Sequence, residues 1–142
     1  MEEQIKAYAE LVIKELRAVS GIDFGYTQES VEWLDGYINR LRDGGMFENV
    51  ETKNKLINGF GSFLGECVIR CHGGTWKLDE SGPWCVVLEN GGMAFPFTKV
   101  RKQIEDGPFD SISSFFRVIP IIFDEVSEAA PSVPKKPWWK LW

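Results

Sequence analysis

Apolar residues recur every three or four positions near the start of the chain. A repeat close to 3.6 residues places such side chains on one face of an α-helix, and that face is normally the buried one. We therefore predict a helix over residues 2–19 with one buried face. The residues of this face are Ile5, Tyr8, Val12, Leu16 and Val19.

A second stretch with the same repeat predicts a helix over residues 28–42. Thr27 is a suitable N-cap because its hydroxyl can accept a hydrogen bond from a free backbone N–H, and Glu29 lies in the first turn, where the helix dipole favours negative charge. The sequence Asp-Gly-Gly at 43–45 predicts the end of the helix. The expected buried face is made of Val31, Leu34, Ile38 and Leu41.

A third helix is predicted from near Thr52 to the glycine pair at 73–74, where a left-handed stop is expected. Three glycines lie inside this helix at positions 59, 61 and 65. Each costs up to about 1 kcal/mol relative to alanine, so we expect a neighbouring backbone to pack closely against them. The predicted apolar side is Leu56, Phe60, Phe63, Leu64, Cys67, Val68 and Cys71.

The apolar period then shortens from 3.6 to 2, which predicts strands over residues 75–79, 83–89 and 92–97. The Asn90-Gly91 step between two of them predicts a hairpin with a type I′ turn, in which both central residues have positive φ. The three strands would form an antiparallel meander. Pro96 is expected at the end or edge of its strand because it has no N–H to donate.

Two short helical patterns follow the strands. Thr98 can cap a basic helix over residues 99–106, and Asp110 or Ser111 can cap the stretch at 111–119. Pro120 interrupts the pattern, so residues 121–130 form either a kinked continuation or a separate helix. Residues 131–142 contain three prolines and no repeat, which predicts a mobile tail.

These elements predict a single α+β domain over residues 1–130. It would have N-terminal helices, a three-stranded antiparallel meander, and C-terminal helices packed on one face of the sheet. Length agrees with one domain, because 142 residues suffice for one core.

Net charge indicates the kind of partner, and the cysteine content and the absence of a signal pattern indicate the cellular compartment. The net charge is −5, but the last twelve residues carry +3, so the other 130 carry 13 basic and 21 acidic residues, a net charge of −8. An acidic body repels nucleic acid and attracts basic partners. The acidic N-terminus does not resemble a signal peptide, and no run approaches the ~18 apolar residues that span a membrane. We therefore expect a cytoplasmic protein with three reduced cysteines and no stable membrane insertion.

The stretch "ECVIRCHGG" (66–74) brings two cysteines close to the single histidine of the chain. Together with Cys85, the residues Cys67, Cys71 and His72 match the ligand types of a structural zinc site, and a cysteine beside a histidine can also be a nucleophile. Three features weaken these hypotheses: neighbouring helical residues point about 100° apart, the spacing is CxxxC, and both helical cysteines fall on an apolar stripe. We therefore expect core thiols with neither metal nor cofactor, and a small enzyme or zinc protein is kept as the alternative.

Glu66 is unusual because it lies in an apolar segment. A buried carboxylate has a raised pKa and can act as an acid or base. Arg70 follows four residues later, in the favourable order for a helix ion pair. An exposed or partly buried Glu66–Arg70 pair is therefore the preferred prediction.

The stretch "GSFLGECVIRCHGGTWKLDESGPWCVVLENGGMAFPFTKVRKQIEDGPFDSISSFF" (61–116) resembles small uncharacterised bacterial proteins. In these, a glycine-containing helix leads into a strand with a tryptophan, then a hairpin, an "FPF-x-K-V-x-K" segment and an amphipathic helix. The resemblance implies an α+β fold and a bacterial cytoplasmic origin, and it assigns no catalytic residue. By size, charge and class the chain is also similar to immunity proteins of bacterial toxin systems.

The function we predict is a non-enzymatic, bacterial protein-binding module, of which an immunity or antitoxin-like protein is the most concrete form. It would occlude a basic partner such as a toxin, or associate with itself. Acidic residues would steer the partner and aromatic residues would anchor it. A solvated helix face beside core aromatics is an equal alternative for the helical members. The predicted acidic residues are Glu29, Glu32, Asp35 and Glu48, and the predicted anchors are Trp33, Tyr37, Phe47, Trp138, Trp139 and Trp142.

Overall fold

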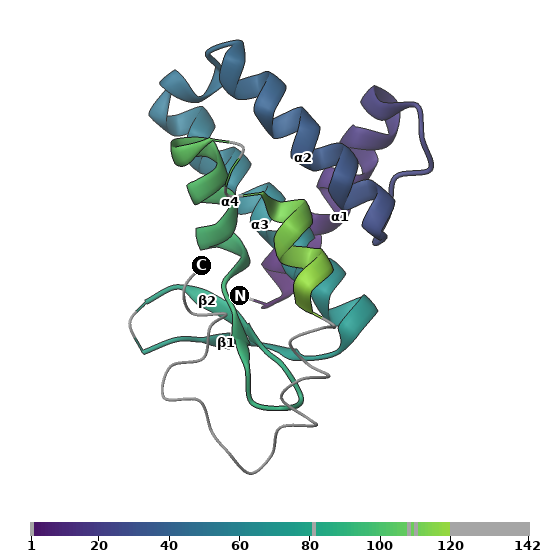
Figure 1. Cartoon of the computed structure of the whole chain (residues 1–142), viewed down its shortest axis with the longest axis vertical. Helices are drawn as coiled ribbons and strands as arrows, with labels where there is room; N and C mark the ends of the chain where they lie inside the picture. Colours follow the sequence, from purple (N-terminus) through teal and green to yellow (C-terminus); the bar gives the residue numbers. More distant parts are fainter. Residues whose placement is uncertain (1, 81, 108, 110, 120–142) are drawn as a thin grey trace.

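The computed structural model describes residues 2–80, 82–107, 109 and 111–119. Its sheet lies at one end of a group of helices, which confirms the predicted α+β class (Figure 1). The predicted segment 121–130 and the tail 131–142 lie outside the described residues. In chain order the elements are α1 (Glu2–Ser20), α2 (Gln28–Asp43), the short 3₁₀ helix η1 (Met46–Glu48), α3 (Val50–His72), β1 (Thr75–Leu78), β2 (Trp84–Val87), β3 (Met93–Ala94), α4 (Pro96–Asp106) and a last helix over 112–119.

Helix α3 is the central element of the fold. It packs against α1, α4 and the sheet, and residues 60–68 are buried on every side of the helix. This explains why the apolar stripe predicted for it widens into an almost continuous apolar run, since a helix surrounded by other elements has no polar face. The core of the molecule therefore lies around the middle of α3.

The glycines of α3 allow aromatic side chains to approach the helix. A Cβ added at Gly61 would lie 2.3 Å from the Phe97 ring, and one added at Gly65 would lie 2.0 Å from the Trp76 ring. The expectation that a backbone packs against these glycines was wrong. Aromatic side chains of α4 and β1 lie against Gly61 and Gly65, and the Val12 side chain of α1 lies against Gly59, 3.1 Å from where a Cβ would be.

The three strands form an antiparallel sheet in the order β1-β2-β3, as predicted. Trp76, Val86 and Ala94 lie opposite one another across the strands, and all three are buried.

No helix among the described residues is both long and apolar enough to cross a lipid bilayer.

The hairpin between β2 and β3 forms at the predicted Asn90-Gly91 step. The Gly91 N–H donates to the Leu88 carbonyl (2.9 Å), and the Leu88 N–H donates to the Gly92 carbonyl (2.7 Å). Gly91 has a φ of 89°, but no other residue type has positive φ in the described part of the chain. The predicted type I′ turn is therefore wrong, and the pattern is that of a turn followed by a left-handed glycine.

Two helix starts differ from those predicted. The Asn49 side chain accepts a hydrogen bond from the Thr52 N–H (3.0 Å), so α3 begins at Val50 rather than at Thr52. Helix α4 begins at Pro96, without the predicted cap at Thr98. Proline fits the first helical position because its missing N–H would have had no partner there. The last strand consequently ends before Pro96.

Candidate functional site

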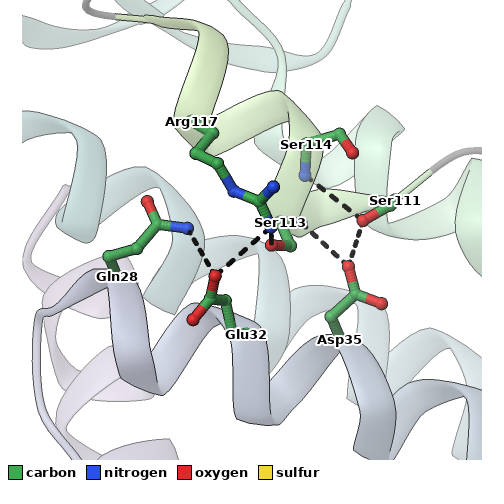
Figure 2. Close-up of polar contacts among 7 residues, drawn as sticks. All are labelled: Gln28, Glu32, Asp35, Ser111, Ser113, Ser114 and Arg117. Carbon is green, nitrogen blue, oxygen red and sulfur yellow. Dashed lines mark hydrogen bonds and ion pairs between the residues drawn. The ribbon is translucent and has the colours of Figure 1, made fainter.

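Some of the acidic residues that were predicted to form a partner-binding surface on α2 instead form contacts within the molecule. The Asp35 carboxylate accepts hydrogen bonds from the Ser111 hydroxyl and from the Ser113 backbone N–H (2.9 Å), as Figure 2 shows. Ser111 in turn caps the last helix by accepting from the Ser114 N–H (3.2 Å). The structure thus places Asp35 at the N-terminus of the last helix, where a carboxylate interacts favourably with the helix dipole.

A buried glutamine completes this contact. Gln103 of α4 accepts a hydrogen bond from the Ile112 N–H (2.8 Å) and donates to the Asp35 backbone carbonyl (3.0 Å). Its amide also lies 3.2 Å from Asn39. Three helices are therefore joined by polar groups whose hydrogen bonds are satisfied, as burial requires.

Glu32 also faces the last helix. Its carboxylate accepts from Arg117 (3.2 Å) and from Gln28 (3.5 Å) (Figure 2). Of the four predicted acidic residues, Glu32 and Asp35 thus have internal partners, while Glu29 and Glu48 are exposed.

The predicted aromatic anchors on α2 form a stack that is partly exposed. The Trp33 and Tyr37 rings lie 4.8 Å apart, and the Arg40 guanidinium lies 5.4 Å from the first ring and 5.6 Å from the second. Phe47 is partly buried against the core. The anchors predicted at Trp138, Trp139 and Trp142 lie outside the described residues.

An apolar groove that includes Tyr37 of this stack is lined by residues of α1, α2, η1 and α3. It encloses about 620 Å³, within the usual range for binding pockets. We call it the α1–α2 groove. Its apolar lining consists of Tyr8, Leu11, Val12, Leu16, Val19, Tyr37, Leu41, Met46, Leu56, Gly59 and Phe60.

Several of these lining side chains are unusually exposed. The exposed fraction is 47% for Tyr8, 53% for Leu11, 58% for Val19 and 47% for Met46. Isolated exposed apolar residues are normal, but a group of them around one groove is typical of an interaction surface.

The predicted buried face of the first helix was wrong at Tyr8 and Val19. The face that packs into the core is made of Ile5, Ala9, Ile13 and Leu16. The sequence contained a signal for the groove that we missed. Leu11 lies outside the predicted stripe, so the helix has more apolar residues than one buried face can hold, and the extra ones can line a groove. Of the predicted partner-binding residues that the structure describes, Tyr37 lines the groove.

The cysteines and the histidine do not meet at one point. Cys67 and Cys85 are buried as expected, but Cys71 is exposed, so its predicted place in the core was wrong. His72 packs against Phe116, with ring centroids 4.9 Å apart and the ring planes tilted by 48°. Within the described part of the chain, no three His, Cys, Asp or Glu side chains are arranged so that they could hold a metal ion.

Burial also works against reactivity in this region. It raises the pKa of the Cys67 thiol, and the nearby Cys71 and Glu66 raise it further. Partial desolvation raises the pKa of the Cys71 thiol, although the residue as a whole is exposed, and partial burial lowers the pKa of His72. A thiol with a raised pKa contains little thiolate at neutral pH and is a poor nucleophile.

Glu66 makes the predicted ion pair with Arg70. Its carboxylate lies 3.5 Å from Arg70 and accepts a hydrogen bond from the Trp76 indole N–H (2.8 Å). The Arg70 side chain is 50% exposed and the Glu66 side chain 3% exposed, so the predicted partly buried pair is confirmed, with the buried end at Glu66. The Arg70 guanidinium lies 4.2 Å from the centre of the Tyr26 ring. These contacts make Glu66 a buried acceptor that joins α3 to β1.

Comparisons with known proteins do not extend this picture: no family model, no curated protein and no solved structure matches the chain. The candidate site is therefore described by its geometry alone, as an apolar groove in the described part of the chain.

Proposed function

We propose that this protein is a non-enzymatic protein-binding module that binds an apolar segment of a partner in the α1–α2 groove. The observation that carries the proposal is the group of exposed apolar side chains around the groove. Removing such side chains from water stabilises a complex by about 25 cal/mol per Å² of apolar surface, before the costs of association. Grooves between helices accept amphipathic segments in this way.

The partner that suits this surface is a basic protein. Residues 1–130 carry a net charge of −8, and Glu29 and Glu48 are exposed near α2 and η1. Exposed charges of one sign speed the approach of an oppositely charged partner, and salt weakens this effect. Occlusion of a basic toxin, as in an immunity or antitoxin-like protein, is the most concrete form of the proposal.

Capture by the immobilised full chain tests the proposal, with Leu11→Asp as the groove variant. Leu78→Asp is the matched control, since Leu78 of β1 is equally exposed (54%) and lies outside the groove. From a lysate of the cells that make the protein, we expect a basic protein to bind the wild-type chain and the control. Its purified form should bind Leu11→Asp at least tenfold more weakly.

Two results would contradict the proposal. One is that every captured protein binds Leu11→Asp and the wild-type chain equally well. The other is that binding to the purified partner responds as strongly to Leu78→Asp as to Leu11→Asp, because the groove would then have no special part in it.

A further inference from the structure

The α1–α2 groove is open in the described part of the chain, and the same chain carries a segment suited to fill it. Residues 135–142, "KKPWWKLW", contain three tryptophans and one leucine among three lysines. A segment this short cannot bury four large apolar side chains by itself. Tryptophan side chains in apolar pockets are also among the strongest contributors to binding.

The segment can reach the groove within one molecule. Phe116 of the last helix contacts His72 at the C-terminus of α3, whereas the groove is lined by residues 52–60 of α3. At 1.5 Å per residue, Thr52 and His72 lie about 30 Å apart along the helix. The 19 residues from Ile119 to Trp138 can span up to ~60 Å when extended, and about 45 Å if the predicted helix over 121–130 forms.

The charges at the groove suit a basic segment. Glu15 lies at its edge and has no ion-pair partner among the described residues, and Lys55, the basic residue of the lining, is paired with Glu51 (3.7 Å). Exposed pairs contribute little free energy, so the lysines would orient the segment and the tryptophans would hold it.

We propose that residues 135–142 occupy the α1–α2 groove of their own chain, so that a partner must displace them. This inference rests on the proposed function, because it assigns an occupant to the same groove. The linker makes the contact efficient: a tethered segment has an effective concentration in the millimolar range. If the free segment binds with a Kd of about 50 μM, an effective concentration of about 1 mM weakens competing ligands about 20-fold.

A labelled peptide of residues 131–142 tests this by fluorescence anisotropy. It is titrated with the full wild-type chain and with the full chain carrying Trp138→Ser, Trp139→Ser and Trp142→Ser. We expect the peptide to bind the triple variant at least tenfold more tightly, because the groove is then free. Adding Leu11→Asp to the triple variant should weaken binding at least tenfold, whereas adding Leu78→Asp should not.

Equal affinity of the peptide for the wild-type chain and the triple variant would overturn the inference. Peptide binding to the triple variant that Leu11→Asp does not weaken would also overturn it. A second measurement separates docking within one chain from docking between chains. A photo-crosslinking amino acid replaces Leu11 in a mixture of ¹⁵N-labelled and unlabelled protein. Crosslinks to residues 135–142 within one isotope support the proposal, and mixed-isotope crosslinks contradict it.

The two proposals can fail separately. If the peptide does not bind but a basic partner depends on Leu11, the groove has the proposed function and the C-terminal segment is not its occupant. If the peptide binds as expected but no partner depends on Leu11, the intramolecular contact stands without the proposed function.

Discussion

At the scale of single residues, the contact between Gly65, Trp76 and Glu66 shows how closely this core is fitted. The Trp76 ring occupies the space that a side chain at position 65 would need, and its indole N–H donates to Glu66. Gly65 does not have a positive φ, so its backbone conformation does not require a glycine. The requirement comes from the Trp76 ring, which leaves no room for a side chain. A helix interior would otherwise favour alanine.

Gly65→Ala should lower the free energy of unfolding by about 2 kcal/mol, because the added methyl group overlaps the Trp76 ring. Urea denaturation measures this change. Gly36→Ala in α2 is the matched control: its Cβ meets only the flexible end of Arg40 at 3.4 Å. The control should raise stability by up to about 1 kcal/mol. A Gly65→Ala protein as stable as the wild type would contradict the geometry described here.

The three thiols should differ in their access to reagent. Cys67 and Cys85 are buried and Cys71 is exposed, so iodoacetamide should modify one thiol per native chain and three after denaturation. Because partial desolvation raises the pKa of the Cys71 thiol, its reaction at pH 7 should be slower than that of a free cysteine. Peptide mass spectrometry identifies the modified site. Rapid modification of Cys67 in the native chain would contradict its burial.

At the scale of elements, the last helix is held by polar contacts from two other helices. Asp35 of α2 accepts from Ser111 and Ser113, and Gln103 of α4 accepts from Ile112. These are backbone and side-chain donors of the first helical turn, which otherwise have no partner within the helix. The start of the last helix thus depends on distant residues, since Asp35 precedes Ser113 by 78 positions.

Asp35→Ala should therefore loosen the last helix more than the rest of the molecule. We expect a loss of about 2 kcal/mol, since hydrogen bonds to a charged group are removed and partly buried donors lose their acceptor. Hydrogen exchange of residues 111–119 should become at least tenfold faster, while exchange in α1 stays unchanged.

Glu32→Ala supplies the comparison, because it removes an exposed ion pair between the same two helices. Its effect should stay within about 0.5 kcal/mol. If the two substitutions had equal effects on exchange in residues 111–119, Asp35 would not be the group that holds this helix.

At the scale of the whole molecule, His72 makes stability depend on pH. Burial lowers its pKa in the folded state below the value of about 6.5 found in unfolded chains, so the unfolded state binds the proton more tightly. The stability that depends on neutral His72 is therefore fully present above about pH 6.5. It falls as the pH drops from that value toward the lowered folded pKa.

Comparing the wild type with His72→Phe isolates this effect, because phenylalanine keeps a ring against Phe116 without titrating. Between pH 7.5 and 5.5 the wild type should lose up to about 1 kcal/mol more than the variant, the size being limited because the imidazole is partly exposed. Urea unfolding at the two pH values measures the difference. Parallel losses in both proteins would show that His72 does not contribute.

In the described part of the chain, the sequence by itself determined the longer helices, the three strands and their order, whereas the short helix η1 was not predicted. Helical and strand periods, the caps at Thr27 and Ser111, and the hairpin at Asn90-Gly91 depend on residues a few positions apart, so they can be recognised locally. The helix boundaries at α1 and α2 came within one residue for the same reason. The interactions that stabilise these local features form within a single helical turn or between two adjacent strands.

Only the tertiary structure decided which surfaces are buried and which are open. Helix α1 has two apolar faces, and the approach of α3 buries Ile5 and Ala9 while Leu11 and Val19 remain exposed. Glu66 is buried because Trp76 covers it, and Asp35 is engaged because Ser111 folds back onto α2. Burial and pairing depend on residues brought together from distant parts of the chain, and no local pattern contains that information.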